Sequence, residues 1–360
     1  MNILLTGGGT AGHVIPALAI ADAINAFNKS AKIFYIGSYN GIEKTLVKNA
    51  GIKYVGISTG KFRRYFDVQN LFDLLRIPWG IIQAFWVLWD IKPKVIFSKG
   101  GFVGLPVVIA GWLHKIPVVI HDSDSIPGLA TKLSAPFAKK ILLAFETAEA
   151  DLYAYRKKIE VVGNPIRLSL FEGKRARGIK MTGFDGKRPV LLVMGGSSGA
   201  QQLNILVQKE KENLTRDFDI IHLSGTGKGS VKKEKHYVEF PYVEDGMRDL
   251  YAITNLALTR AGANTIAELN ALQIPALLYP LGTHASRGDQ MANAQIMAEE
   301  SSLFMIADED KDPLNQLLLL PARSNKILGD GVTQKVALIL LSYVGKSDSK
   351  AGSWTNPTQV

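Results

Sequence analysis

Two short stretches of this sequence share one pattern, in which an apolar run enters a cluster of glycines and a helical pattern follows. The first run, Asn2–Thr6, leads into GGGTAG at positions 7–12, and the second, Pro189–Met194, leads into GGSSGA at positions 195–200. Such a turn lets backbone N–H groups and the positive end of the helix approach an anion. The repetition predicts one Rossmann-like architecture used twice, with an anion-binding turn in each half.

Other short apolar runs alternate with helical patterns along the chain, as they do in parallel α/β units. In the first half the predicted strands are Asn2–Thr6, Lys32–Ile36, Lys94–Phe97, Pro117–Ile120 and Lys140–Leu143. In the second half they are Pro189–Met194, Asp219–Leu223, Leu256–Leu258 and Ala276–Tyr279. The predicted fold class is therefore α/β, with two doubly wound parallel sheets.

The boundary between the two halves falls at Pro165, which ends an extended segment. We expect one domain over residues 1–164 and a second over residues 165–332. A helix at about 333–345 is expected to pack back on the first domain. Residues 346–360 are polar without periodicity, which is typical of a disordered tail.

Composition narrows the classes of protein that this chain can belong to. The 360 residues include no cysteine, which excludes disulfides and thiolate metal sites and fits a reducing compartment. The apolar N-terminus suggests a buried strand and no signal peptide, and no apolar run reaches the roughly 20 residues of a spanning helix. The net charge of +10 indicates an anionic partner or a surface with surplus lysine.

The first glycine turn formally fits the G-x-G-x-x-G pattern of dinucleotide-binding proteins, through Gly7, Gly9 and Gly12. In those proteins an acid after the second strand holds the ribose. Here that strand is followed by Gly37-Ser38-Tyr39, without an acid. The pattern therefore favours phosphate binding without a nicotinamide cofactor, and we expect no cofactor.

Several polar residues in the first half should meet at the carboxyl edge of its sheet, where ligands bind in open α/β folds. His13 follows the glycine turn and is either a general base or a histidine bonded to backbone. His121, Asp122 and Asp124 follow the strand at 117–120. Asp122-x-Asp124 fits the D-x-D pattern of metal-dependent sugar transferases, but so does Asp308-x-Asp310, and we expect no metal.

In the second half, residues 259–265 (TRAGANT) follow a strand and open a helix that carries Glu268. The open N–H groups of that helix could hold a diphosphate. Glu268 either accepts hydrogen bonds from ribose hydroxyls or only complements the helix dipole. Gln290 is a candidate amide partner for a sugar hydroxyl. The loop at 225–230 (GTGKGS) lacks the order of residues that a Walker A loop requires.

A basic and aromatic stretch runs from Lys61 to Trp89. KFRRYF at 61–66 is followed by apolar residues that include Trp79, Trp86 and Trp89. Cations beside exposed aromatic rings suit an anionic membrane surface. The alternative is an ordinary buried helix behind a basic loop. Because aromatic and basic residues are not interleaved elsewhere, we expect no nucleic-acid partner.

Five motifs together resemble those of the family-28 glycosyltransferases, the N-acetylglucosamine transferases of peptidoglycan synthesis. They are GGGTAGHVIP at 7–16, KGGFV at 99–103, VGNPIR at 162–167, GGSSGA at 195–200 and RAGANT at 260–265. The resemblance implies the GT-B fold, with two Rossmann-like domains facing across a cleft. It also implies inverting transfer of N-acetylglucosamine from UDP-N-acetylglucosamine to the 4-hydroxyl of undecaprenyl-diphosphate-linked muramoyl-pentapeptide, at the cytoplasmic face of the cell membrane.

The resemblance also assigns residues to the two substrates. The acceptor side and the cleft carry Thr10, Ala11, Gly12, His13 and Asp124. The donor side carries Arg167, Ser197, Val243, Ala263, Asn264, Thr265, Glu268 and Gln290. His13 is the preferred base, Asp122 is the second candidate, and the backbone of Val243 would hold uracil.

The chain differs from the common family pattern at two places. Ala11 stands where many members have glycine, and HDSD at 121–124 stands where many have HEQN. An aspartate at position 124 only accepts hydrogen bonds when ionised, whereas asparagine also donates them. Two alternatives of related fold remain, a diacylglycerol glycosyltransferase and a UDP-N-acetylglucosamine epimerase.

Overall fold

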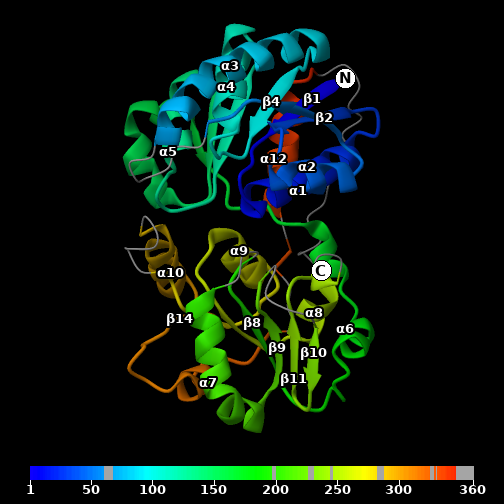
Figure 1. Ribbon diagram of the computed structural model, residues 1–360, viewed down its shortest axis with the longest axis vertical. Helices are drawn as coiled ribbons and strands as arrows, with labels where there is room; N and C mark the ends of the chain where they lie inside the picture. Colours follow the sequence, from blue (N-terminus) through cyan, green and yellow to red (C-terminus); the bar gives the residue numbers. More distant parts are fainter. Residues whose placement is uncertain are drawn as a thin grey trace.

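The computed structural model describes residues 1–60, 68–196, 200–225, 231–243, 246–281, 288–324, 328–329 and 331–345, and for residues 68–75 it describes the backbone alone. Figure 1 shows two lobes stacked along the long axis, each with its own sheet. The upper lobe holds the N-terminal half of the chain and the lower lobe holds the C-terminal half. Each sheet has seven strands, so the prediction of two α/β domains is confirmed.

The N-terminal sheet has the strand order β3-β2-β1-β4-β5-β6-β7, and all of its pairs are parallel. The strands are β1 (Asn2–Thr6), β2 (Lys32–Ser38), β3 (Lys53–Ile57), β4 (Val95–Ser98), β5 (Val118–Asp122), β6 (Lys140–Leu143) and β7 (Ile159–Val161). Helices cover both faces, so the central strands are mostly apolar and buried, with polar residues chiefly at their carboxyl ends. Leu4 of β1, for example, pairs with Phe34 on one side and Ile96 on the other.

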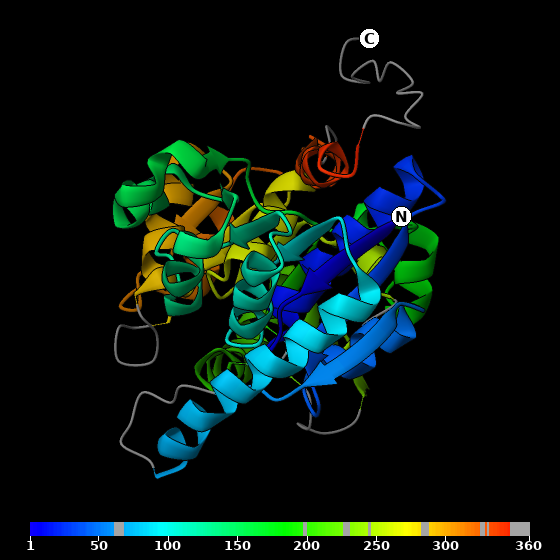
Figure 2. The same ribbon diagram turned by 90° about the horizontal axis from the view of Figure 1, so that it is seen from above.

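Helices α1 and α2 cover one face of this sheet, and α3 and α4 cover the other (Figure 1). The helices are α1 (Ala11–Phe27), α2 (Ile42–Asn49), α3 (Val68–Ile91), α4 (Gly104–Leu113) and α5 (Leu129–Ser134), with 3-10 turns η1 (Ala135–Phe137) and η2 (Glu146–Lys158). Seen from above in Figure 2, α3 runs along the outside of the lobe.

The C-terminal sheet has the order β10-β11-β9-β8-β12-β13-β14, and only the β10–β11 pair is antiparallel. The strands are β8 (Val190–Met194), β9 (Asp219–Leu223), β10 (Lys232–Glu234), β11 (Tyr237–Phe240), β12 (Leu256–Thr259), β13 (Ala276–Leu278) and β14 (Phe304–Ile306). The helices are η3 (Leu168–Glu172), α6 (Arg175–Thr182), α7 (Gln201–Asp217), α8 (Met247–Ile253), α9 (Ala263–Ala271), α10 (Asp289–Glu300), α11 (Pro313–Leu318) and α12 (Gly331–Ser342).

The predicted strands are all present, with ends that differ by at most two residues, but β3, β7, β10, β11 and β14 were not predicted. Four of these five are edge strands and the fifth, β11, lies next to one, and all are short or carry charged residues. β10, with the sequence KKE, is exposed at every position. An edge strand of this kind lacks the apolar run from which buried strands are recognised.

Both sheets reverse their strand order at the strand that carries a glycine turn. β1 lies between β2 and β4, and β8 lies between β9 and β12. The crevice at such a switch point is where open α/β sheets bind ligands. The topology therefore places the turn at 7–12, and Gly195 and Gly196 after β8, at the carboxyl edges of their own sheets.

The last helix returns to the N-terminal lobe. Val336, Ala337 and Leu340 of α12 are buried in the same core cluster as Val14 and Ala17 of α1. In Figure 2 this helix, in red, lies beside the N-terminal lobe. The chain therefore crosses between the lobes a second time, and the helix expected at about 333–345 begins two residues earlier.

Candidate functional site

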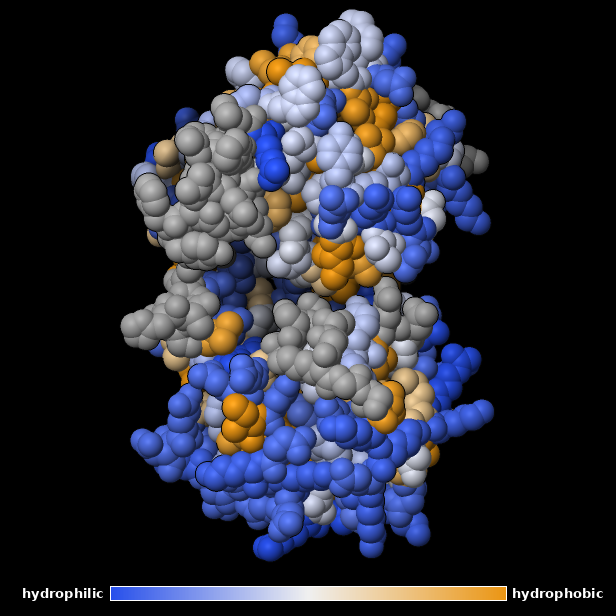
Figure 3. All heavy atoms as spheres, in the orientation of Figure 1, coloured by the Kyte–Doolittle hydropathy of each residue, from blue (hydrophilic) through white to orange (hydrophobic). Residues whose placement is uncertain are grey.

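A cleft of about 480 Å³ opens between the two lobes, and residues of both line it. The space-filling view in Figure 3 shows the molecule hollowed at this level. The predicted site residues that line it are Thr10, Ala11, Gly12, His13, Asp124, Arg167, Val243, Ala263, Asn264, Thr265, Glu268 and Gln290. Ser197 lies outside the described residues, and Asp122 does not line the cleft. The structure thus brings the two predicted sets of residues together.

The buried carboxylate of Glu43 supports the first glycine turn through hydrogen bonds. Glu43 of α2 accepts hydrogen bonds from Gly9 N at 3.3 Å and Ser38 N at 2.9 Å. A Cβ atom on Gly8 would lie 2.7 Å from the Glu43 carboxyl carbon, so only glycine fits there. Sequence reasoning missed Glu43, because it is far from the glycines in the chain. Ala11 begins α1, where an L-residue needs no special backbone angle, so the alanine is accommodated.

His13 lies in the first turn of α1 and packs against the glycine turn that follows β4. A Cβ on Gly101 would lie 3.1 Å from His13 Cδ2, and Gly101 has φ +76°. The backbone N–H of His13 donates to Thr10 O at 3.2 Å. The KGGF motif therefore provides the flat surface on which the imidazole rests, next to the cleft.

Asp122 and Asp124 have different surroundings although they stand two residues apart. Asp122 is buried, and its two oxygens accept from Asp124 N at 3.2 Å and Gly128 N at 2.9 Å. Asp124 lines the cleft and accepts from Asn293 Nδ2 at 3.2 Å. Asp122 thus holds the loop in place, while Asp124 lies at the surface of the cleft.

The start of α9 supplies open backbone donors on the C-terminal side. Gly262 is its N-cap residue, and among the described residues no side chain caps this end. The first hydrogen bond inside the helix is from Ile266 N to Gly262 O, so the helix itself supplies no acceptor for the N–H groups of residues 263–265. The helix dipole adds to the attraction for an anion.

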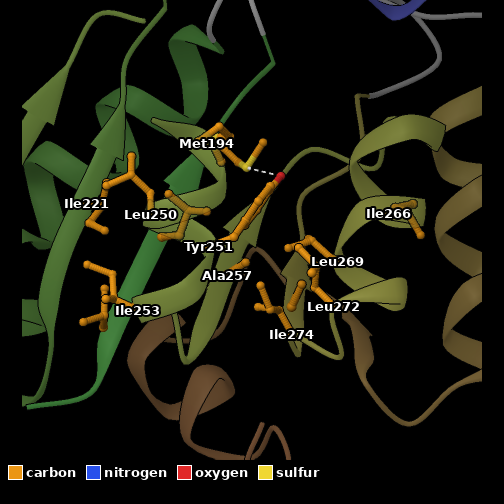
Figure 4. Packing of buried hydrophobic residues seen from close by; sticks show 14 of the residues in the cluster. Met194, Ile221, Leu250, Tyr251, Ile253, Ala257, Ile266, Leu269, Leu272 and Ile274 are labelled. Atoms are coloured by element: carbon orange, nitrogen blue, oxygen red, sulfur yellow. Dashed lines mark hydrogen bonds between the residues drawn. The ribbon is translucent and has the colours of Figure 1, made fainter. Parts of the chain in front are cut away.

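Glu268 lies one turn further along α9, between two partners. The Tyr251 hydroxyl donates to Glu268 Oε2 at 2.8 Å, and Arg167 Nη2 lies 3.6 Å from Oε1. Burial raises the pKa of Glu268, and Arg167 and Tyr251 oppose this rise. Figure 4 shows the Tyr251 side chain within the C-terminal core, with its hydroxyl close to Met194. Sequence reasoning missed Tyr251, which lies within a short, largely buried helix that carries no motif.

Gln290 lines the cleft from the same lobe as Glu268, at the start of α10. Its Oε1 accepts from Leu281 N at 3.0 Å, which fixes the orientation of the amide group. Val243 lines the cleft beside Tyr242 and Met247. These contacts are compatible with the predicted roles of Gln290 and Val243 in sugar and base recognition.

Two asparagines connect the lobes across the cleft. Asn264 Nδ2 donates to Gly12 O at 2.7 Å, so α9 is tied to the first turn of α1. Asn293 of α10 is fully buried and accepts from Ser125 N at 2.9 Å. Each joins residues that are far apart in the sequence, which is why Asn293 was not predicted from the sequence.

In the parts of the chain that the structure describes, no three His, Asp or Glu side chains converge as they do around a metal ion. Within the same residues, no helix combines the length and apolar character required to span a bilayer.

Comparisons with known proteins agree with this geometry. Residues 3–143 match the glycosyltransferase family 28 N-terminal domain, and residues 190–321 match the C-terminal domain of that family. The chain belongs to glycosyltransferase family 28. Within that family it is similar to MurG, the UDP-N-acetylglucosamine–N-acetylmuramyl-(pentapeptide) pyrophosphoryl-undecaprenol N-acetylglucosamine transferase.

The relative from Lachnospira eligens is 45% identical over 317 residues, which cover 87% of this chain and 88% of the relative. The relative from Legionella pneumophila (strain Lens) is 44% identical over 311 residues, which cover 86% and 85%. The crystal structure of Acinetobacter baumannii MurG has a TM-score of 0.67 at 22% identity and covers 95% of this chain and 99% of its own. A UDP-GlcNAc 2-epimerase from Methanocaldococcus jannaschii shares the fold, with a TM-score of 0.64 at 15% identity and cover of 95% and 99%.

Proposed function

We propose that this chain transfers N-acetylglucosamine from UDP-N-acetylglucosamine to the 4-hydroxyl of the muramoyl-pentapeptide on undecaprenyl diphosphate. Membership in family 28 and close similarity to the named transferases support the reaction. The observation that carries the assignment of sites is the two-sided cleft. One wall offers the turn at 7–12 with His13, and the other offers the open start of α9 with Glu268.

The reaction is a single displacement at C1 of the donor sugar. The acceptor oxygen forms a bond to C1 while the bond from C1 to the UDP oxygen breaks, which inverts the configuration. His13 takes the proton of the acceptor hydroxyl as general base. The N–H groups at the start of α9 stabilise the charge that develops on departing UDP. The proposed chemistry requires no metal ion.

The donor nucleotide is assigned to the C-terminal wall. Glu268 would accept hydrogen bonds from the ribose hydroxyls, and Arg167 and Tyr251 keep its carboxylate in place. The backbone of Val243 would hold the base, and Gln290 would meet the sugar. Ser197 completes the proposed donor set from outside the described residues.

The acceptor is assigned to the N-terminal lobe, which also carries a surface suited to a membrane. On α3, Trp79, Trp86 and Trp89 are 55%, 65% and 61% exposed, so this face of the helix is not buried. Trp112, at the end of neighbouring α4, is also exposed. Pale and orange residues gather on the upper lobe in Figure 3, whereas the lower lobe is mostly blue. We propose peripheral binding of this lobe to an anionic membrane, where the lipid-linked acceptor resides.

A transfer assay with two competing acceptors tests the proposal. Radiolabelled UDP-N-acetylglucosamine is offered together with lipid-linked muramoyl-pentapeptide and diacylglycerol, with and without a chelator. We expect label only on the muramoyl-pentapeptide and no effect of the chelator. Label on diacylglycerol would assign the chain to the lipid glycosyltransferases. Conversion of the donor sugar without any acceptor would assign it to the epimerases.

A further inference from the structure

A buried lysine lies behind Ser123, a residue that lines the cleft. Lys99 follows β4 and is only 1% exposed. Its Nζ lies 2.9 Å from His121 Nδ1 and 3.2 Å from Asn164 Oδ1, and it also donates to Ser123 Oγ. These three partners come from β5, from the loop after β5 and from the crossover between the lobes. One ammonium group thus joins three segments that surround the site.

Every proton of this ammonium has an acceptor. His121 Nε2 lies 2.9 Å from Gly163 O, a carbonyl that can only accept, so the imidazole carries its proton on Nε2 and accepts at Nδ1. Ser123 Oγ donates to Asn164 Oδ1 at 3.1 Å and therefore accepts from Lys99. A neutral amine has only two protons and carries a lone pair, so it could not donate to all three partners and could itself accept a hydrogen bond.

The lysine sets the direction of a chain of amide groups across the cleft. Because Lys99 can only donate, Asn164 must turn Oδ1 toward it and Nδ2 away. Asn164 Nδ2 then donates to Asn264 Oδ1, which leaves Asn264 Nδ2 to donate to Gly12 O at 2.7 Å. If the first amide were reversed, Asn264 would turn its oxygen toward the Gly12 carbonyl, and the contact would become repulsive.

We propose that Lys99 is a positioning residue of the transfer reaction, which orients the relay Asn164–Asn264–Gly12 and so holds the donor helix α9 against the acceptor turn. This proposal rests on the proposed function. The backbone after Lys99 strengthens the effect, because the turn at Gly100 and Gly101 supports the His13 ring. Loss of the relay would let the two substrates drift apart, and small displacements of reacting groups lower turnover strongly.

The charge state of Lys99 gives the proposal a pH signature. Burial lowers its pKa to about 8, and Asp122 and Asp124 partly oppose this. The other titratable groups that face it are His121 of β5 and, across the Gly100–Gly101 turn, His13 of α1. The ammonium, which can only donate and therefore fixes the direction of the relay, is present below a pH of about 8 and is lost as the pH rises further.

The free energy of unfolding depends on pH in the opposite direction to turnover. This difference distinguishes the effect of Lys99 on stability from its effect on catalysis. The unfolded chain keeps the lysine protonated up to its ordinary pKa of 10.5, whereas the folded chain releases the proton at about 8. Between these values the unfolded state binds more protons, so this group's contribution to the free energy of unfolding rises with pH. Turnover is expected to fall over the same range.

The test compares Lys99→Met and Asn164→Asp with a matched control. Asn164→Asp still accepts from Lys99 but cannot donate to Asn264. The control is Lys158→Met, because Lys158 donates to the backbone of Ala135 and Pro136 in the same lobe, away from the cleft. We expect each test variant to lower kcat about a hundredfold and the double variant to lose little more, because both break one relay. Lys158→Met should keep the wild-type kcat.

Two further measurements distinguish a positioning role of Lys99 from a role in the stability of the fold alone. The wild-type kcat should fall above a pH of about 8, and this fall should be absent in Lys99→Met and weaker in Lys99→Arg, which keeps its charge. Hydrogen exchange of residues 11–16 and 263–268 should be faster in both test variants than in the control. The exchange measurement is independent of catalysis, so it tests the relay even if the wild-type chain transfers no sugar and the proposed function fails.

Three outcomes would overturn the role of Lys99. One is a kcat of Lys99→Met within about twofold of wild type. Another is an unchanged alkaline fall in that variant. The third is a double variant whose losses multiply, because this would show that Lys99 and Asn164 act independently.

Discussion

The Tyr251 hydroxyl donates a 2.8 Å hydrogen bond to the Glu268 carboxylate, where the C-terminal core meets the cleft. Tyr251 is only 1% exposed, so its hydroxyl cannot form a hydrogen bond with solvent instead. The surrounding core holds the side chain in place. The bond therefore fixes the direction in which Glu268 presents its oxygens. It also favours the ionised form of a group whose pKa burial has raised.

Replacing Tyr251 with phenylalanine tests this relationship. The variant should raise the donor KM about tenfold, as expected for one lost hydrogen bond to a charged group. Because the pKa of Glu268 would rise further, the effect should grow as the pH is lowered. Steady-state kinetics at several pH values checks this, with Tyr153→Phe as control, because Tyr153 is 64% exposed. A rise in the acceptor KM instead would place Glu268 on the acceptor side.

His13→Ala should lower kcat about a hundredfold to a thousandfold, the usual contribution of a general base. UDP affinity should stay nearly the same, since the imidazole rests on the Gly100–Gly101 turn of the N-terminal lobe. Calorimetric titration with UDP and single-turnover transfer measure the two quantities separately. The control is His236→Ala, a histidine bonded to Asp219 at 2.7 Å in the other lobe. Unchanged turnover in His13→Ala would remove this residue as the base.

Asp122→Asn distinguishes the second candidate base from a loop-shaping residue. The carboxylate accepts from the N–H groups of Asp124 and Gly128, and an asparagine would turn a donor toward one of them. We expect the free energy of unfolding to fall by about 1–3 kcal/mol, while kcat falls less than tenfold. Urea unfolding and transfer kinetics on the same samples check this. A hundredfold loss of kcat without a loss of stability would support Asp122 as base.

Acid should destabilise the chain through a histidine in the C-terminal lobe. His222 is buried, bonded to Tyr237 and Asn204, and burial lowers its pKa from 6.5 to about 4. The unfolded state therefore binds a proton first as the pH falls from 6.5 towards 4, and stability is lost over that window. The integrated effect is about 3 kcal/mol. Urea unfolding at several pH values should show this slope, and His222→Gln should reduce it.

The sequence predicted the parts of the fold that depend on local pattern. Buried central strands and the two glycine turns were found, because apolar runs and glycine clusters are visible within a few residues. The edge strand β10 was missed, since it is polar and is held by pairing with β11. Its pairing is local, because β11 follows after Lys235 and His236, but the charged, exposed strand has no apolar pattern from which it could be predicted.

The residues of the site also fall into two groups, those that a local motif predicts and those that depend on contacts in the folded chain. Residues in turns and at helix starts, such as His13 and Thr265, were predicted because those positions have a known affinity for anions. Tyr251 and Asn293 act through contacts made by helices that carry no motif. Lys99 was noticed only as part of KGGF. Its burial and its three partners depend on where β4, β5 and the crossover meet in space.

The exposed tryptophans of α3 give the last prediction, on membrane binding. Trp86 and Trp89 are 65% and 61% exposed, and the Trp89 ring lies 6.2 Å from that of His114 beside α4, so the apolar surface spans both helices. Replacing both tryptophans with glutamine should weaken binding to anionic vesicles at least tenfold, because aromatic side chains anchor a protein at the headgroup level. Transfer to a long-chain acceptor in vesicles should fall in parallel, whereas transfer to a short-chain, water-soluble acceptor should not. The control is Ile205→Gln on α7, a residue that is 60% exposed in the other lobe. Equal losses with both acceptors would show that these tryptophans support the fold or the cleft and not the membrane contact.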